Sequence, residues 1–201
     1  MRKIGVIFGG MSTEHEVSIS SGTSIISNLD KQKYEILPIY ISKSGEWYKY
    51  TKPVNDIIPL HVGDEITELE KIENEFECLK SLDIAFPVLH GLYGEDGTIQ
   101  GLLELLKIKY VGCKVLSSSI CMDKVYAKIV FDKAQIPQAD YAYVKAEKGK
   151  YTYVHKNFDE ETLDLDQICK KIESKLGLPV FVKPSNSGSS VGIKKAENIE
   201  E

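Results

Sequence analysis

The strongest constraint on the fold of this chain is an uninterrupted apolar segment, residues 4–8, which ends at Gly9 and Gly10. A strand that is apolar at every position has to be covered on both faces, which is typical of a central strand in a parallel sheet. In open α/β sheets, ligands bind beyond the carboxyl ends of such strands. The segment therefore predicts a parallel α/β sheet with a candidate ligand site at its glycine pair.

Residues 1–116 continue with the alternating strands and helices of a doubly wound α/β domain. A helix over residues 16–28 is expected, and its small residues would let it pack closely on the sheet. Four positions are expected on its buried face: Val17, Ser21, Ile25 and Leu29. Further strands are expected at 34–41 and 83–89 and a helix at 98–106, with no element assigned within 53–80.

Residues 117–201 have a different, α+β pattern. The expected elements are a helix capped by serines 117–119 and running to about 134, a hairpin of 141–146 and 151–154, a helix over 161–176, and strands at 178–183 and 190–195. Residues 196–201 resemble the beginning of another helix, which indicates a shortened chain. These patterns predict two domains, 1–116 and 117–201.

The composition argues against several classes of protein. A net charge of −5 does not suit a nucleic-acid partner, and no apolar run approaches the roughly 20 residues of a membrane span. The N-terminal apolar stretch is too short for a signal peptide. The four cysteines lack metal-ligand spacing, and we expect buried thiols in a reducing cytoplasm.

The first candidate site is the loop after the glycine pair, where Glu14 and Glu16 flank His15 at a helix start. Two glycines allow a tight turn with exposed N–H groups, and a pair of carboxylates suits a cationic group such as an amino-acid ammonium. The third glycine of a dinucleotide-binding loop is absent. The alternative is a helix N-terminus at which the acids complement the dipole.

The second candidate site is the loop of residues 90–98, which follows another predicted strand and would face the same crevice. It contains His90, three glycines and the acids Glu95 and Asp96. A turn capped by Thr98 would explain part of this pattern. The regular glycine spacing beside an exposed histidine exceeds that need, so we expect a functional loop.

Two further segments carry lysines. Lys183 ends an apolar strand, which would bury its stem, and the Ser/Gly loop of residues 184–192 then offers several N–H and O–H donors. This combination suits nucleotide phosphates, although the Walker pattern is absent and a flexible polar hairpin is the alternative. Lys124 and Lys128 share a helix face, which by itself indicates only a solvated stripe.

Together, four segments in order resemble the D-alanine:D-alanine ligases of the ATP-grasp superfamily: residues 8–18, 90–101, 122–124 and 182–192. Each segment is weakly specific alone, but the ordered set is very specific. The resemblance implies an α/β fold with a doubly wound N-terminal substrate domain, 1–116, and the first α+β lobe of an ATP-grasp domain, 117–201. It also implies that acidic Mg²⁺ ligands follow after residue 201.

The resemblance further implies roles for individual residues. Glu14 would hold the ammonium of the first D-alanine, His90 would lie near this substrate, and Ser189 would couple to Glu14. Four residues would bind ATP: Lys124, Lys183, Ser189 and Ser190. In the family, ATP phosphorylates the carboxylate of one D-alanine, and the amine of a second attacks the acyl phosphate.

The resemblance also implies a homodimer through the N-terminal domain and peptidoglycan precursor synthesis. Residues 1–201 alone are expected to be inactive, because phosphoryl transfer depends on bound Mg²⁺. Alternatives stay open: D-serine or D-lactate as second substrate, a non-catalytic nucleotide-binding module, or another ATP-grasp enzyme such as a carboxylase. The loop around Glu14 argues against a carboxylase, which has no ammonium to hold there.

Overall fold

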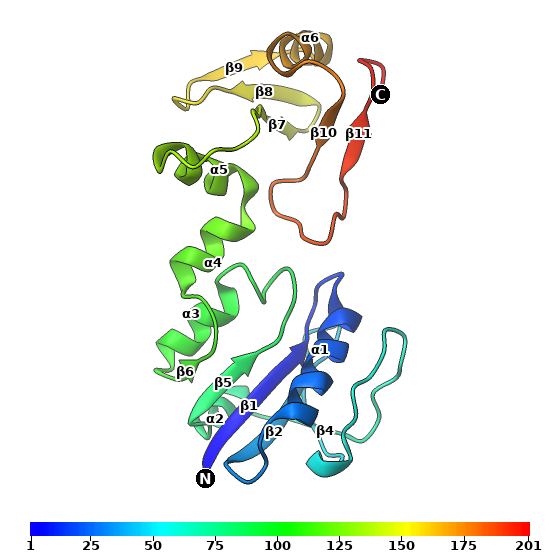
Figure 1. Cartoon of the computed structure of the whole chain (residues 1–201), viewed down its shortest axis with the longest axis vertical. Coiled ribbons are helices and arrows are strands. Elements are labelled where there is room, and N and C mark those ends of the chain that lie inside the picture. The colour runs from blue at the N-terminus through cyan, green and yellow to red at the C-terminus, as the bar shows by residue number, and fades with distance from the viewer. The chain divides into compact units, whose positions relative to one another are not determined.

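The computed structural model describes residues 1–201, which form two compact units, Met1–Met122 and Asp123–Glu201. Figure 1 labels the elements of both. The expected division after residue 116 falls inside helix α4 (Val115–Met122), and the break between the units follows this helix. The helix stays with the first unit because Ser118 is buried and the Ser119 hydroxyl donates to the Asp96 carbonyl at 2.8 Å.

The first unit contains a six-stranded sheet in the order β4-β3-β2-β1-β5-β6. Its strands are β1 (Arg2–Gly9), β2 (Tyr34–Ile41), β3 (Trp47–Tyr50), β4 (Leu69–Lys71), β5 (Ile84–Pro87) and β6 (Lys109–Tyr110). β1 pairs in parallel with β2 and β5, and β6 continues this parallel part, whereas β3 and β4 are antiparallel. The prediction that residues 4–8 form a central parallel strand is confirmed.

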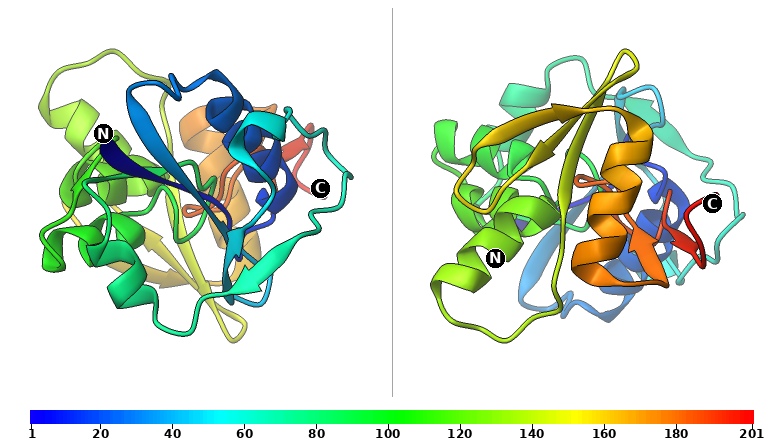
Figure 2. Two further views of the ribbon diagram at one scale, coloured as in Figure 1. Left: turned by 90° about the horizontal axis from the view of Figure 1, so that it is seen from below. Right: turned by 90° about the horizontal axis from the view of Figure 1, so that it is seen from above.

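Both faces of this sheet are covered, as a doubly wound domain requires. On one face, α1 (His15–Asn28) and the 3-10 helix η1 (Val54–Asp56) surround a buried cluster that includes Val6 and Phe8. On the other face, α2 (Glu75–Lys80) and α3 (Thr98–Leu105) pack around Ile7. Figure 2 shows α1 and α3 on opposite sides of the sheet. Successive residues of β1 therefore enter opposite cores, which explains the unbroken apolar segment.

The predicted buried face of α1 is only partly confirmed, because Ile25 and Leu29 pack against the core but Val17 does not. Val17 is 44% exposed, and the buried residues of the helix are His15, Ser18, Ile19, Gly22, Thr23 and Ile26. A Cβ on Gly22 would lie 2.5 Å from the Cβ of Phe8. The smallest residues of α1 face the sheet because they permit this close approach, and the bulkier Val17 turns outward.

The second unit combines helices with two small antiparallel sheets. Its elements are α5 (Lys124–Lys133), the sheet β7-β8-β9 (Tyr143–Glu147, Lys150–Val154, Glu160–Leu163), α6 (Leu165–Leu176) and the ribbon of β10 (Val180–Val182) with β11 (Lys194–Ala196). The expected hairpin is confirmed, with Tyr143 opposite Val154. Tyr153 is buried in β8 and accepts a hydrogen bond from Lys175 of α6 at 2.9 Å, so helix and sheet share one small core.

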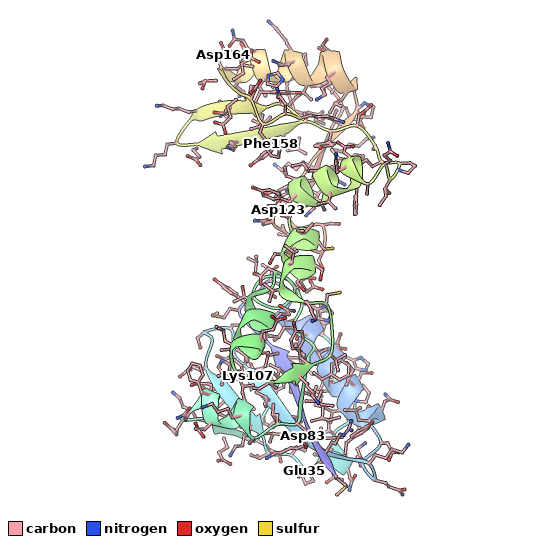
Figure 3. The ribbon with its side chains drawn as sticks, turned by 90° about the vertical axis from the view of Figure 1, so that its left-hand side faces the viewer. Glu35, Asp83, Lys107, Asp123, Phe158 and Asp164 are labelled. Carbon is pink, nitrogen blue, oxygen red and sulfur yellow. The ribbon has the colours of Figure 1, made fainter.

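Two helix boundaries predicted from the sequence are wrong. The helix expected over 117–134 is broken at Asp123, whose backbone is extended and whose carboxylate caps the first turn of α5. Residues 161–163, expected within a helix, belong to β9 (Glu160–Leu163), and α6 begins after Asp164, which makes a capping box with Gln167. Figure 3 labels both aspartates. In each case a capping carboxylate sets the first helical turn.

Three smaller expectations also need correction. Residues 197–200 form a bend and a turn instead of the start of a helix. Residues 190–193 lie outside β11, so the second strand of the ribbon is shorter than expected. All four cysteines are free thiols, but none is fully buried: Cys78 and Cys169 are partly buried, and Cys113 and Cys121 are exposed. No helix in residues 1–201 is both long and apolar enough to cross a membrane.

Candidate functional site

The glycine pair after β1 makes a turn that is fixed by the neighbouring strands. Gly9 and Gly10 have φ angles of 90° and 94°, and the Gly10 amide donates to the Ile41 carbonyl of β2 at 2.8 Å. A Cβ on Gly9 would lie 2.2 Å from the same oxygen, so no side chain fits there. The Ser18 hydroxyl accepts from Gly9 N at 2.9 Å and donates to the Val88 carbonyl at 2.6 Å. The turn is thereby tied to the chain on both sides of β1.

The loops after β1 and β5 meet at Glu14 and Gly91. A Cβ on Gly91 would lie 2.6 Å from Glu14 Oε2 and 3.3 Å from the Cβ of Ser12, so the carboxylate lies directly against the Gly91 backbone. The Ser12 hydroxyl donates to the His90 carbonyl at 2.6 Å and accepts from Glu14 N at 3.1 Å. Two of the residues proposed from the sequence, Glu14 and His90, therefore belong to one site.

The partly buried His90 side chain is held by α1. Its Nε2 lies 3.1 Å from the Ser21 hydroxyl. Ser21 was expected only to pack against the sheet, and it provides instead a polar contact with the second loop. The backbone and the side chain of His90 are thus both bonded to the segment that carries Glu14.

His15, between the two acids in the sequence, has a structural role. It is buried, its Nδ1 lies 2.6 Å from the Gly10 carbonyl, and its Nε2 lies 3.2 Å from the Tyr40 hydroxyl. A carbonyl oxygen can only accept, so Nδ1 carries the hydrogen and Nε2 of the neutral ring accepts from Tyr40. His15 therefore stabilises the glycine turn through its hydrogen bond to the Gly10 carbonyl.

Asp96 organises the rest of the second loop. Its two carboxylate oxygens accept from Tyr93 N at 2.8 Å and Thr98 N at 2.9 Å. Burial acts to raise the pKa of Asp96, but these amide hydrogen bonds outweigh burial and hold the pKa below its usual value. On the far side of the loop, Gln100 Nε2 donates to the Gly94 carbonyl at 2.8 Å.

Acid is expected to loosen this loop. Because the pKa of Asp96 is lowered by folding, its bonds stabilise the loop fully above the unfolded value of about 3.9. That stabilisation is lost as the pH falls through the lowered folded pKa. The NMR shifts of the Tyr93 and Thr98 amides should report the change, and Asp96→Asn should abolish their pH dependence. Amide shifts in the native protein that stay constant through this acid range would contradict the assignment.

In the second unit, the structure joins two segments that the sequence left apart. Lys124 N donates to the Ser185 carbonyl at 3.0 Å, and Lys124 Nζ donates to the Ser187 carbonyl. Within the loop, Val191 N donates to the Gly188 carbonyl at 3.0 Å. The Ser/Gly loop of residues 184–192 is therefore anchored on the N-terminal turn of α5.

The remaining phosphate candidates are all exposed. Ser189 and Ser190 have φ angles of 44° and 62°, a left-handed conformation that is uncommon for residues with a side chain. The predicted burial of the Lys183 stem is wrong, because β10 pairs only with β11 and Phe181 beside it is 61% exposed. The Lys183 ammonium lies 5.9 Å from the centre of the Phe181 ring.

Sequence reasoning missed the serines that join the first two loops. Ser12 and Ser18 were noted only as part of a loop and as small residues, yet each donates to a carbonyl at the exit of β5. A signal was present, because serines recur through residues 12–27. Serine is unfavourable inside a helix, so such a series indicates hydrogen bonds to neighbouring segments.

Residues 1–201 contain no group of three His, Cys, Asp or Glu side chains that could hold a metal ion. Glu14 and Glu16 do not form such a group, since the Glu16 carboxylate pairs with Lys43 at 3.1 Å. The resemblance implies Mg²⁺ ligands after residue 201, and we assign no chemical step to a metal held by residues 1–201.

Comparison with protein families gives two matches. Residues 3–113 match the model described as "D-ala D-ala ligase N-terminus", and residues 130–201 match "D-ala D-ala ligase C-terminus". A D-alanine–D-alanine ligase of Clostridium acetobutylicum is 50% identical and one of Caldicellulosiruptor bescii 47% identical, over 100% and 99% of this chain. The chain spans about half the length of these relatives, 55% and 54% respectively.

Solved structures give the same result. A D-alanine-D-alanine ligase from Coxiella burnetii has a TM-score of 0.75 at 30% identity, over 100% of this chain and 58% of that one. The VanG D-Ala:D-Ser ligase from Enterococcus faecalis has a TM-score of 0.71 at 36% identity, over 96% of this chain and 55% of that one. A Bacillus anthracis D-alanine–D-alanine ligase complexed with ATP has a TM-score of 0.64 at 35% identity, over 98% of this chain and 51% of that one.

Proposed function

Given that this chain belongs to the D-alanine–D-alanine ligase family, we propose that it supplies the substrate-binding part of a ligase that joins two D-alanines with ATP. The α/β fold expected from the resemblance, a doubly wound unit followed by an ATP-grasp lobe, is confirmed by the structural matches. The observation that carries the proposal is the Glu14 carboxylate against Gly91, beside His90.

Glu14 and His90 form the proposed site for the first D-alanine. The carboxylate of Glu14 is an acceptor for an ammonium, and the neighbouring imidazole of His90 can serve the other end of an amino acid. The Ser12 hydroxyl bonds the backbone of both residues and so holds their two loops together before a substrate arrives. Such preorganisation lowers the cost of orienting the substrate.

The loop anchored on Lys124 forms the proposed ATP-binding part. Its cation and the N–H and O–H groups of Ser189 and Ser190 suit phosphate oxygens, and Lys183 is proposed on the adenine side. The γ-phosphoryl group passes from ATP to a carboxylate oxygen of the first D-alanine, and ADP leaves. The amine of the second D-alanine then attacks the carbonyl carbon, phosphate leaves, and the amine loses a proton.

A chimera tests this function, with residues 1–201 followed by the remaining part of the Clostridium acetobutylicum ligase. It should release phosphate from ATP in the presence of Mg²⁺ only when D-alanine is added. Glu14→Gln should raise the KM for the first D-alanine at least about tenfold, because a charge-assisted bond is lost. The matched control is Glu16→Gln, since that acid pairs with Lys43 on the surface. Equal effects of the two changes would remove Glu14 from the ammonium site.

Residues 1–201 by themselves are proposed to be inactive, with weak or absent ATP binding. A nucleotide-binding module would bind ATP at physiological concentration, and calorimetry on this chain separates the two functions.

The D-Ala:D-Ser ligase among the structural matches keeps D-serine as an alternative second substrate. A homodimer through the first unit and a cytoplasmic location, which suits four free thiols, belong to the same proposal.

A further inference from the structure

The helix α1 contains several hydroxyl groups. That of Ser18 bonds backbone groups outside the helix, at Gly9 and Val88, and that of Ser21 contacts a side chain of another segment. Thr23 Oγ1 donates to the Ile19 carbonyl at 2.8 Å, and Ser27 Oγ donates to the Ser24 carbonyl at 2.8 Å, so both turn back onto their own helix. Ser21 Oγ instead lies 3.1 Å from Nε2 of His90, which is 69 residues away in the sequence. This contact points to a role outside the helix.

The proton arrangement follows from the available acceptors. Among residues 1–201, the hydroxyl of Ser21 has no other hydrogen-bond partner than His90 Nε2. If Nε2 carried the hydrogen, the Ser21 hydroxyl hydrogen would have no protein acceptor in this partly buried position. If Ser21 donates, both groups are satisfied, and the hydrogen of the neutral imidazole lies on Nδ1.

The Nδ1–H group then complements Glu14. His90 is adjacent to Gly91, whose backbone touches the Glu14 carboxylate, and the His90 carbonyl is fixed by Ser12 at 2.6 Å. Glu14 thereby supplies an anionic acceptor and His90 an N–H donor, on two loops that are joined through Ser12. An α-amino acid has the opposite pair, an ammonium donor and a carboxylate acceptor.

We propose that Ser21 is a positioning residue whose hydroxyl donates to His90 Nε2, fixes the Nδ1–H tautomer and leaves this N–H for the carboxylate of the first amino-acid substrate. The inference rests on the proposed function for its substrate, but the tautomer itself does not. The two parts can therefore fail separately.

The tautomer is tested on residues 1–201 labelled with ¹⁵N, without any substrate. Long-range ¹H–¹⁵N spectra near neutral pH should show a protonated Nδ1 and an unprotonated Nε2 for His90. The signals of His90 are assigned because they disappear in the His90→Gln variant. Ser21→Ala should produce a mixture of tautomers, and Ser21→Thr should retain the native one. Ser20→Ala is the matched control, because this neighbouring hydroxyl has no hydrogen bond in the structure. A protonated Nε2 in the native chain, or an unchanged spectrum in Ser21→Ala, overturns the proposal.

The substrate part is tested in the chimera. Ser21→Ala should raise the KM for the first D-alanine about tenfold with a smaller change in kcat, and Ser21→Thr should restore it. A changed tautomer with an unchanged KM overturns the carboxylate contact. A chimera without any D-alanine-dependent activity overturns the proposed function instead, because the spectra decide the tautomer alone. Should Ser21→Ala not fold, the native spectrum and Ser21→Thr still decide it.

Discussion

Replacing Gly9 by alanine is expected to lower the free energy of unfolding of the first unit by about 3 kcal/mol. Two costs combine in this variant. A φ of 90° is unfavourable for any residue with a side chain, and the new Cβ would lie 2.2 Å from the Ile41 carbonyl. Relief of that clash requires the chain to move away from β2, which breaks the hydrogen bond from Gly10 N to the same oxygen.

Gly63 provides a matched control for this change. Its φ is 98°, but a Cβ there would meet nothing within 4 Å, so Gly63→Ala reports the backbone strain alone, about 1 kcal/mol. Trp47 is the only tryptophan and packs against the core of the first unit, so its fluorescence during denaturant unfolding measures both variants. Equal losses in the two variants would contradict a steric role of the Ile41 carbonyl.

Replacing Lys124 by methionine is expected to release the Ser/Gly loop of the second unit. The ammonium donates to the Ser187 carbonyl, and methionine keeps the length of the side chain without any donor. A charged hydrogen bond contributes about 1.5–3 kcal/mol. Hydrogen exchange at the amides of Val191 and Ile193, which close turns within this loop, should therefore accelerate at least about tenfold without nucleotide.

Lys133→Met is the control for this loop experiment, since Lys133 lies in the last turn of the same helix and its ammonium makes no hydrogen bond in the structure. It should leave the loop amides unchanged. If Lys124 served only ATP phosphates, the loop would exchange at the native rate in Lys124→Met without nucleotide. That result would separate phosphate binding from loop anchoring. An ammonium has three donors, so the two roles are compatible in the native protein.

Much of the candidate site was predictable because its residues follow strands. The apolar segment at 4–8 places the loop with Glu14 at the carboxyl end of β1. The strand expected at 83–89, which is β5 in the structure, places His90 in the same way. Parallel strands end at the same edge of a sheet, so the two loops were expected at one edge, and the pairing of β1 with β5 brings them into contact. Helix starts were less predictable, because Asp123 and Asp164 override periodicity through capping.

The sequence by itself determined the class of fold, the central strands β1, β2 and β5, and the loops that carry charged side chains. Only the tertiary structure decided which side chains touch: Glu14 against Gly91, Ser21 against His90, and Lys124 against Ser187. Periodicity and turn residues act over a few positions, whereas these contacts join residues 63 to 77 positions apart. Such contacts depend on strand order and on how closely α1 approaches the sheet at Gly22, which no local pattern encodes.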